Sequence, residues 1–349
     1  PKLGLAAAAG SADHAPMTTR TWRLESRPHG TDFARALRLT EGPVIEPSYG
    51  EIVIRNQWLS MDAGTRMWMS GRTDGYQPPL PLGAAMSGLV IGRVTASRHK
   101  DFPEGTLVRA FGQWADYSKV DAVLSGAIAL DESVGDTRAW FGPLGMNGWT
   151  ALWGIERTGA AKAGETVLVS AAAGATGLLA CQIARLLGCK VWGMAGGPEK
   201  CAALTRDYGL AGAIDYKAGR VLDALSATGG IDVYFDNVGG PLVDDVLVTM
   251  NHYGRVAVCG LVADYNSGTR THPREFDQVL MRRLRIEGFF SPDFMHHGPE
   301  LTGRLRQWHE AGELDLPYDV TRGLENTLTA YDRMLSGKTF GKVVVELEP

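Results

Sequence analysis

The stretch VLVSAAAGATGLLACQIARLLG, residues 167–188, decides the fold. It runs from a short apolar segment through a loop of small residues into a pattern typical of a helix. A strand, such a loop and a helix together form the context in which a dinucleotide-binding fingerprint carries meaning. Ala172, Gly174 and Gly177 occupy its three small-residue positions, with alanine where the first glycine is usual. The stretch therefore predicts a nucleotide-binding turn; a purely structural Gly/Ala turn is the alternative.

Each residue of this loop has an expected part. Gly174 lets the backbone approach a pyrophosphate, and Gly177 lets the helix pack closely on its strand. Ala172 permits the turn as long as its φ stays negative. The helix begins near Ala175 and Thr176, where free N–H groups and a positive partial charge favour phosphate. We therefore expect the pyrophosphate at this helix N-terminus.

The segments that follow indicate a doubly wound parallel sheet. Further apolar strand candidates occur after the loop, most of them separated by helical patterns. Alternating strands and helices are typical of a parallel sheet covered on both faces. The candidates are residues 190–196, 212–216, 231–239, 254–260 and 284–290. Together with the strand at 167–170 they predict a Rossmann-like α/β domain.

The first part of the chain has a different rhythm, with short strands and glycine-rich turns, which favours a compact, barrel-like β unit. The tail at 325–348 predicts a helix and then a strand that returns to this unit. We therefore expect a nucleotide domain at 139–309, inserted in a substrate domain formed by 17–138 and 310–349. Residues 1–16 show no pattern and are interpreted as a tag or disordered segment, with Met17 as the natural start.

Composition narrows the class of protein. The net charge is −4 and no basic stripe is present, which argues against nucleic acid as a partner. No apolar run reaches the roughly 18 residues of a membrane span. The four cysteines form no CxxC pair and no zinc-type cluster with histidine, so we expect no metal. This cysteine usage fits a reducing compartment, and we expect a cytoplasmic protein.

The end of the second strand bears on which dinucleotide binds. An NAD site places an acid there to bind the ribose 2′-hydroxyl, but this chain has Gly196 and Gly197. Lys200 and Tyr216 follow nearby and can bind a 2′-phosphate instead. NADP(H) is therefore the predicted cofactor. A solvated lysine and an aromatic strand cap are the plain alternatives for these two residues.

Several motifs together resemble one family, the zinc-independent medium-chain dehydrogenase/reductases. Within it the chain is similar to the NADPH-dependent alkenal/one and prostaglandin (leukotriene) reductase branch. The resemblance implies a Rossmann sheet inserted in a GroES-like β-barrel domain, NADP(H) as cofactor and a homodimer joined near residues 284–290. The motifs are WLSMDAGTRM (58–67), LGMNGWTA (144–151), VLVSAAAGATG (167–177), GGPEKC (196–201), IDYK (214–217), FDNVGG (235–240), VCGLVADYN (258–266) and GKTFGKVVV (337–345).

The resemblance also implies cofactor contacts. The pyrophosphate loop corresponds to Gly174, Ala175, Thr176 and Gly177, and the 2′-phosphate contacts to Lys200 and Tyr216. The ribose and nicotinamide contacts correspond to Asn237, Cys259, Gly260, Leu261, Tyr265, Phe289, Phe290, Ser291 and Thr339. Two positions depart from the family pattern: Gly64 stands where many relatives have tyrosine, and Thr339 where they often have asparagine. Both departures bear on substrate preference.

The stretch PLGAAMSG (81–88) lacks the zinc ligands of metal-dependent relatives, which bears on the reaction. Reducing a carbonyl generates an alkoxide that usually needs a Lewis acid or proton donor. Reducing a conjugated C=C bond spreads the charge onto the carbonyl oxygen, where hydrogen-bond donors suffice. Tyr265 is the candidate catalytic donor; cofactor packing alone is the alternative. Met61, Arg66, Met146 and Tyr265 are the expected substrate contacts.

The predicted function is therefore NADPH-dependent reduction of the C=C bond of small hydrophobic α,β-unsaturated aldehydes or ketones. A quinone reductase or a zinc-free alcohol dehydrogenase on the same fold is the second interpretation. A nucleotide-binding protein without catalysis is the third, because a fold does not fix a function. The pair His296–His297 is interpreted as a surface loop rather than a metal site, since neighbouring residues face different ways.

Overall fold

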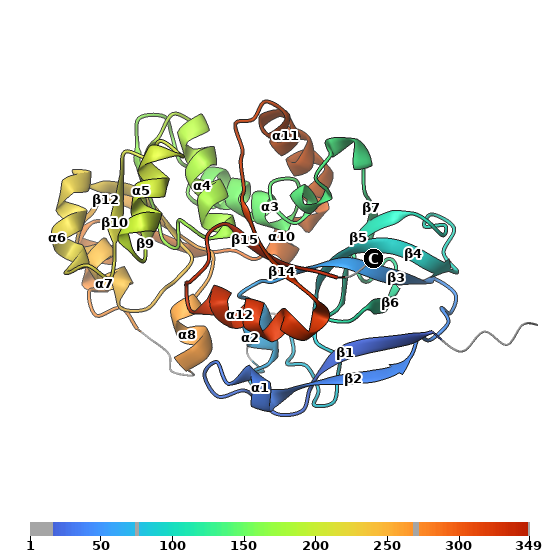
Figure 1. Cartoon of the computed structure of the whole chain (residues 1–349). Helices are drawn as coiled ribbons and strands as arrows, with labels where there is room; N and C mark the ends of the chain where they lie inside the picture. Colours follow the sequence, from blue (N-terminus) through green and yellow to red (C-terminus); the bar gives the residue numbers. More distant parts are fainter. Residues whose placement is uncertain (1–16, 74–76, 268–271, 348–349) are drawn as a thin grey trace, which may run out of the picture.

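The computed structural model describes residues 17–73, 77–267 and 272–347. The expected tag or disordered segment at 1–16 lies outside the described residues. Two domains stand side by side in Figure 1, with the parallel sheet on the left and the β domain on the right. The chain enters the β domain, crosses to the parallel sheet and returns.

A six-stranded parallel sheet forms the core of the nucleotide domain. Its strand order is β10-β9-β8-β11-β12-β13, so the chain starts in the middle of the sheet and builds outward in both directions. This order is that of a Rossmann fold, as the sequence predicts. The strands are β8 (Thr166–Val169), β9 (Lys190–Ala195), β10 (Gly212–Asp215), β11 (Ile231–Asp236), β12 (Met250–Val258) and β13 (Arg285–Gly288).

Helices cover both faces of this sheet because its strands are apolar on both sides. Val167 and Val169 pack with α3, α4 and α11 on one face, and Leu168 packs with α6 and α7 on the other. The helices are α3 (Met146–Trp153), α4 (Ala175–Leu186), α5 (Pro198–Arg206), α6 (Val221–Leu225), α7 (Leu242–Leu247), α8 (Val262–Ser267), α9 (Asp277–Met281), α10 (Ser291–Phe294) and α11 (Gly298–Glu310). Short helical turns are η3 (Gly154–Thr158), η4 (Ser226–Thr228) and η5 (Met295–His297).

The β domain is built on a seven-stranded sheet whose path runs β14-β15-β3-β4-β5-β7, with β6 also paired to β3. A two-stranded ribbon of β1 and β2 packs beside it. Its strands are β1 (Thr18–Leu24), β2 (Leu37–Pro43), β3 (Glu51–Ser60), β4 (Ser87–Ser97), β5 (Leu107–Gln113), β6 (Tyr117–Asp121), β7 (Ile128–Ala129), β14 (Tyr318–Arg322) and β15 (Lys342–Glu346). Its helices and turns are α1 (Phe33–Ala36), α2 (Thr65–Trp68), η1 (Glu132–Val134), η2 (Thr137–Trp140), η6 (Leu324–Asn326) and α12 (Thr327–Leu335).

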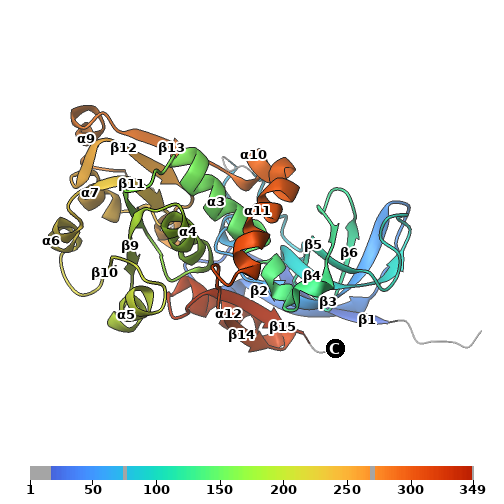
Figure 2. The same ribbon diagram turned by 90° about the horizontal axis from the view of Figure 1, so that it is seen from above.

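The tail of the chain closes the β domain. Strand β15 pairs antiparallel with β3, and β14 pairs with β15. The nucleotide domain is therefore inserted in the β domain, which confirms the predicted fold. Figures 1 and 2 show α12 and β15 on the side of the β domain that adjoins the nucleotide domain, so the returning segment reaches the boundary where the site is found.

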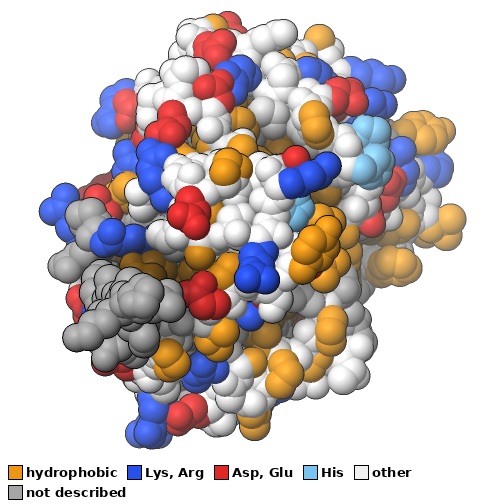
Figure 3. Space-filling view, turned by 90° about the vertical axis from the view of Figure 1, so that its right-hand side faces the viewer, with side chains coloured by type: hydrophobic (Ala, Val, Ile, Leu, Met, Phe, Trp, Pro, Cys, Tyr) orange, Lys and Arg blue, Asp and Glu red, His pale blue; other side chains and the backbone are white. Residues whose placement is uncertain are grey.

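On the face shown in Figure 3, Lys and Arg side chains are interspersed with Asp and Glu. No continuous basic surface is visible on that face. Within the described residues, no helix is both long and apolar enough to span a bilayer.

Candidate active site

The turn after β8 has the geometry that a pyrophosphate needs. Gly174 caps α4 in an extended conformation, with φ −89° and ψ 169°. A Cβ on Gly177 would lie 2.2 Å from the carbonyl oxygen of Ala171, so only glycine fits there. The strained residue of the turn is Ala171, with φ 46°, whereas Ala172 is not among the residues of positive φ. Ala172 therefore keeps the conformation that the sequence argument requires.

The first turn of α4 faces the cavity through Ala175, Thr176 and Gly177. A helix N-terminus leaves its first N–H groups without partners inside the helix. Asn147 of α3 donates from Nδ2 to the hydroxyl of Thr176 at 3.0 Å, which fixes this turn against the neighbouring helix. Asn147 lies within the motif LGMNGWTA (144–151), but no contact was predicted for it, because sequence spacing does not show which residue of another helix it meets. These residues fit a bound pyrophosphate.

At the carboxyl end of β9, the side chains of Tyr216 and Lys217 pack against Gly196 and leave no space for a side chain there. A Cβ on Gly196 would lie 2.7 Å from the Tyr216 hydroxyl and 2.8 Å from Cε of Lys217. The nearby carboxylate of Asp215 accepts hydrogen bonds from the N–H groups of Gly197 and Lys217, both at 2.9 Å. Lys200 also faces this part of the cavity. A group carrying negative charge fits here, as the predicted 2′-phosphate requires.

A buried polar network supports the ends of β8 and β11. Asp236 is 2% exposed, and its Oδ1 accepts from the hydroxyls of Ser170 and Tyr234 at 3.0 and 2.8 Å. The N–H groups of Val238 and Gly239 donate to the same oxygen at 2.9 Å. Asn237 donates from Nδ2 to the Ser170 carbonyl at 2.7 Å. This network fixes the backbone around Asn237, the predicted ribose contact.

Tyr265 lies on α8, at the carboxyl edge of the sheet where ligands bind in such folds. The backbone N–H of Leu261 donates to its hydroxyl at 3.1 Å, which holds the ring toward the cavity wall. Cys259 lies close by, and burial, followed by the charge of Asp236, raises the pKa of its thiol to about 12. This cysteine is therefore a neutral thiol at neutral pH.

One cavity of about 650 Å³ brings most of the predicted site together. Lys200 and several glycines of the nucleotide domain line it, together with methionine and aromatic side chains. The predicted residues that line it are Met61, Met146, Gly174, Ala175, Thr176, Gly177, Lys200, Tyr216, Asn237, Cys259, Gly260, Tyr265, Phe289, Phe290, Ser291 and Thr339. Gly64 lines it as well. A cavity of this size and mixed lining is typical of a cofactor and substrate site.

Two predicted residues are absent from this lining, Arg66 and Leu261. Arg66 is buried and donates from Nη2 to the carbonyl oxygens of Pro28 and Gly30, at 2.9 and 3.3 Å. Its guanidinium therefore holds a loop rather than facing a substrate. Leu261 contributes its N–H to Tyr265, while its own side chain is 42% exposed.

An ion pair that sequence reasoning missed also borders the cavity. Lys342 donates from Nζ to Asp62 Oδ1 at 2.6 Å and to the Met61 carbonyl at 2.9 Å. The Ser60 hydroxyl donates to the other carboxylate oxygen of Asp62. Because the two partners are 280 residues apart in the chain, no local pattern pairs them. The ion pair fixes the end of β3 against the start of β15.

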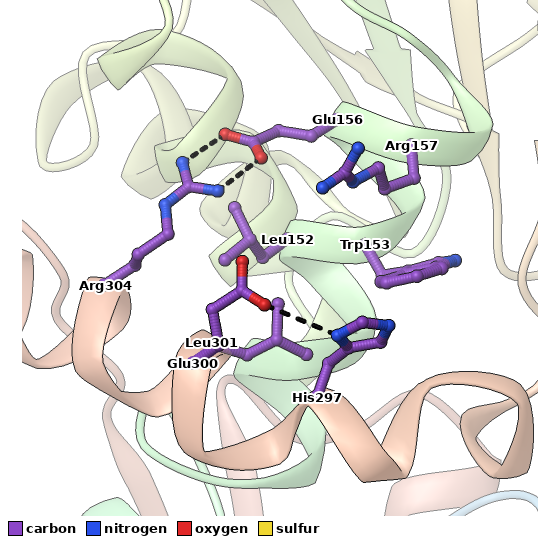
Figure 4. A pocket seen from close by; sticks show the side chains of 8 residues that line it. All are labelled: Leu152, Trp153, Glu156, Arg157, His297, Glu300, Leu301 and Arg304. Carbon is purple, nitrogen blue, oxygen red and sulfur yellow. Dashed lines mark hydrogen bonds and ion pairs between the residues drawn. The ribbon is translucent and has the colours of Figure 1, made fainter.

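Figure 4 shows a second, much smaller cavity between α3 and α11. Its volume is about 10 Å³, which is room for one water molecule. Arg304 closes it with a two-point ion pair to Glu156, and His297 contacts Glu300 at 3.3 Å. This cavity is too small for a nucleotide or an enone, so the large cavity is the candidate site.

The described residues contain no group of three or more His, Cys, Asp or Glu placed to hold a metal ion. The pair His296–His297 lies with its rings 4.1 Å apart, next to Trp153.

An inserted Rossmann sheet with a cavity at its carboxyl edge is the architecture of two-domain, dinucleotide-dependent oxidoreductases. Residues 20–126 match the family described as N-terminal domain of oxidoreductase, and residues 175–305 match that described as zinc-binding dehydrogenase. The chain is 36% identical over 338 residues to the NADPH-dependent curcumin reductase of Escherichia coli (strain K12), covering 94% of this chain and 96% of that protein. It is 36% identical to the NADP(+)-dependent 2-alkenal reductase of Nicotiana tabacum, covering 84% and 87%.

A solved structure of CurA from Vibrio vulnificus in complex with NADPH superposes with a TM-score of 0.88. It shares 34% identity and covers 95% of this chain and 99% of that one. The chain therefore belongs to the zinc-independent medium-chain dehydrogenase/reductases, in their NADPH-dependent alkenal/one reductase branch.

Proposed function

We propose that this protein reduces the C=C bond of α,β-unsaturated aldehydes and ketones with NADPH. The observation that carries the proposal is the cavity of about 650 Å³, which is lined both by the pyrophosphate turn with Lys200 and by an apolar wall. The family membership and the names of the relatives support the same reaction class. Met61, Met146, Phe289 and Phe290 form the apolar wall and suit a hydrophobic enone.

When bound, NADPH would supply the hydride that reduces the β-carbon of the substrate. The residues of the chain place the two reactants and exclude water. The turn from Gly174 to Gly177 holds the pyrophosphate, and Lys200 and Tyr216 hold the 2′-phosphate. Tyr265 directs its hydroxyl to the substrate carbonyl oxygen, where negative charge develops. We assign the proton that reaches the α-carbon to solvent water.

Product analysis with NADPH deuterated at the transferred position tests this reaction. The substrates are an aliphatic enone, the saturated ketone of the same size and a benzoquinone. We expect deuterium on the β-carbon of the enone product and no turnover of the ketone. Deuterium on a carbonyl carbon would instead indicate an alcohol dehydrogenase, and turnover of quinone alone a quinone reductase. NADPH binding without turnover of any substrate would indicate a protein without catalysis.

We also propose a homodimer, formed by pairing of β13 with its copy. Strand β13 ends the six-stranded sheet, and all four of its residues are exposed. An exposed strand edge offers unpaired backbone groups to another strand. Ile286 is 39% exposed on this edge, and Leu280 and Met281 of α9 are 74% and 58% exposed. A second copy supplies both the backbone partner and an apolar cover.

Light scattering of Ile286→Lys tests the dimer, with Val320→Lys as the matched control. Val320 is 38% exposed on β14, which ends the other large sheet. We expect Ile286→Lys to yield monomers and Val320→Lys to leave the dimer intact. A dimer that survives the first substitution would contradict the pairing.

All four cysteines are free, which supports a reducing compartment such as the cytoplasm.

A further inference from the structure

The segment Ser336–Gly341 connects α12 to β15 within the β domain and lies against the nucleotide domain. We name these residues the C-terminal strap. The N–H of Gly341 donates to the carbonyl of Ala173, at 2.8 Å, within the pyrophosphate turn. Phe340 packs on the apolar core of the nucleotide domain, with its ring 6.0 Å from that of Tyr208. The strap therefore belongs to one domain by sequence and contacts the other.

Lys200 holds the strap at the adenosine end of the cavity. Its ammonium donates to the carbonyl oxygens of Gly337 and Thr339, at 2.7 and 2.6 Å. An ammonium has three N–H donors, so one remains after these two bonds. A Cβ on Gly337 would lie 3.9 Å from the Tyr216 hydroxyl, so the strap adjoins both expected 2′-phosphate ligands. Gly337 and Thr339 also line the cavity.

Lys217 adds a second positive charge beside Lys200. Burial lowers the pKa of the Lys200 ammonium, and the charge of Lys217 lowers it further. Within the described part of the chain, neither ammonium has an acidic side chain within 4 Å; the nearby Asp215 carboxylate accepts from two backbone N–H groups instead. The charge of Lys217 acts on the Asp215 carboxylate, whereas no acidic group among the described residues acts on Lys200, so the two neighbouring cations favour an added anion.

We infer that Lys200 is a positioning residue for the strap as well as a ligand of the 2′-phosphate, so that NADPH binding fixes the strap more firmly than NADH binding does. Two donors of Lys200 hold the strap and the third binds phosphate, while Lys217 supplies the second charge. A bound phosphate keeps Lys200 in the conformation that reaches Gly337 and Thr339. Coupling between two sites is reciprocal, so a strap that is held also favours the phosphate. The inference rests on the proposed NADPH site.

Hydrogen exchange of the strap amides, measured on the full chain, tests this coupling without any substrate. In the wild type we expect NADPH to slow exchange at 337–341 more than saturating NADH does. Lys200→Met removes the ammonium at similar length. We expect it to raise strap exchange by at least about tenfold in the free protein, because two charge-assisted hydrogen bonds are lost. We also expect Lys200→Met to remove the difference between NADPH and NADH in how strongly they slow exchange of the strap amides.

Lys217→Met is the matched control, because Lys217 has no bond to the strap. We expect it to weaken NADPH binding about tenfold, with NADH binding and strap exchange in the free protein unchanged. Phe340→Ala loosens the strap without altering either cation. By reciprocity it weakens NADPH binding more than NADH binding, as calorimetry would show.

Unchanged strap exchange in Lys200→Met, or equal protection by NADPH and NADH, would overturn the inference. Either result leaves the proposed reaction intact if the enone is still reduced. Conversely, a strap that responds to NADPH in a protein that reduces no enone would keep the inference and reject the reaction. A protein that does not bind NADPH would reject both.

Discussion

Lys342 Nζ lies 2.6 Å from Asp62 Oδ1, and the two side chains differ in exposure, 1% against 34%. The lysine is thus enclosed, while the carboxylate can still be hydrated from the cavity. A buried charge that loses its partner is costly, whereas a partly exposed one recovers solvent. Removing the carboxylate should therefore cost more stability than removing the ammonium.

We predict that Asp62→Ala destabilises the protein by about 3 kcal/mol, because the buried ammonium keeps only the Met61 carbonyl. Lys342→Met costs about 1 kcal/mol, since the Asp62 carboxylate retains the Ser60 hydroxyl and water. Urea denaturation of the two variants measures the difference. Equal losses, or a larger loss for Lys342→Met, would show that the ammonium is not the enclosed partner.

The turn glycines offer a second prediction. Gly177→Ala brings a Cβ to 2.2 Å from the Ala171 carbonyl, so we expect a loss of about 2 kcal/mol and much weaker NADPH binding. Gly303→Ala is the control, because a Cβ there has no atom within 4 Å and the residue lies inside α11. We expect Gly303→Ala to raise the free energy of unfolding by up to about 1 kcal/mol. Wild-type NADPH affinity in Gly177→Ala would contradict the assigned close approach.

The parts of the fold that follow from local pattern could be predicted from the sequence. Strands β8 to β13 are short apolar runs between helices, and each was predicted near its observed position. Strands β2 and β14 were not predicted, because their residues are mostly polar and exposed, and β7 was not predicted because it has only two residues. Tyr265 and Asn237, expected at the site from their positions after strands, do line the cavity, while their roles there stay predictions.

Contacts between distant segments could not be predicted. Lys200 was predicted as a phosphate ligand, but its two carbonyl partners lie 137 and 139 residues away on the strap. Arg66 was expected at the substrate, yet its guanidinium turns to the carbonyls of Pro28 and Gly30. A charge in a sequence motif shows that a polar contact is needed but does not show which segment of the fold supplies it.

The pKa of about 12 at Cys259 has two measurable consequences. At neutral pH its thiolate fraction is about a thousandth of that of a thiol at the ordinary value of 9, so we expect thiol-reagent labelling in the native state to be slower by a similar factor. Because the folded pKa is raised, its contribution to stability is present below pH 9 and is lost as the pH rises from 9 toward 12. We therefore expect Cys259→Ala to lose less stability than the wild type as the pH rises from 9 toward 12. Labelling as fast as in urea would contradict the raised pKa of this thiol.

The hydroxyl of Tyr265 is the last test of the site. Tyr265→Phe keeps the ring that lines the cavity and removes the oxygen that accepts from Leu261 N–H. We predict a ten- to hundredfold fall in kcat for an enone, because a donor to the developing negative charge is lost. The dissociation constant for NADPH stays within about twofold, since the cofactor contacts at Lys200 and the turn remain.

Tyr49→Phe is the control, because Tyr49 is 94% exposed and is not among the residues that line the cavity. Stopped-flow hydride transfer separates chemistry from product release. If Tyr265→Phe transfers hydride at the wild-type rate, then backbone donors or the cofactor's own ribose hydroxyl carry the charge, and Tyr265 only packs against the ligand.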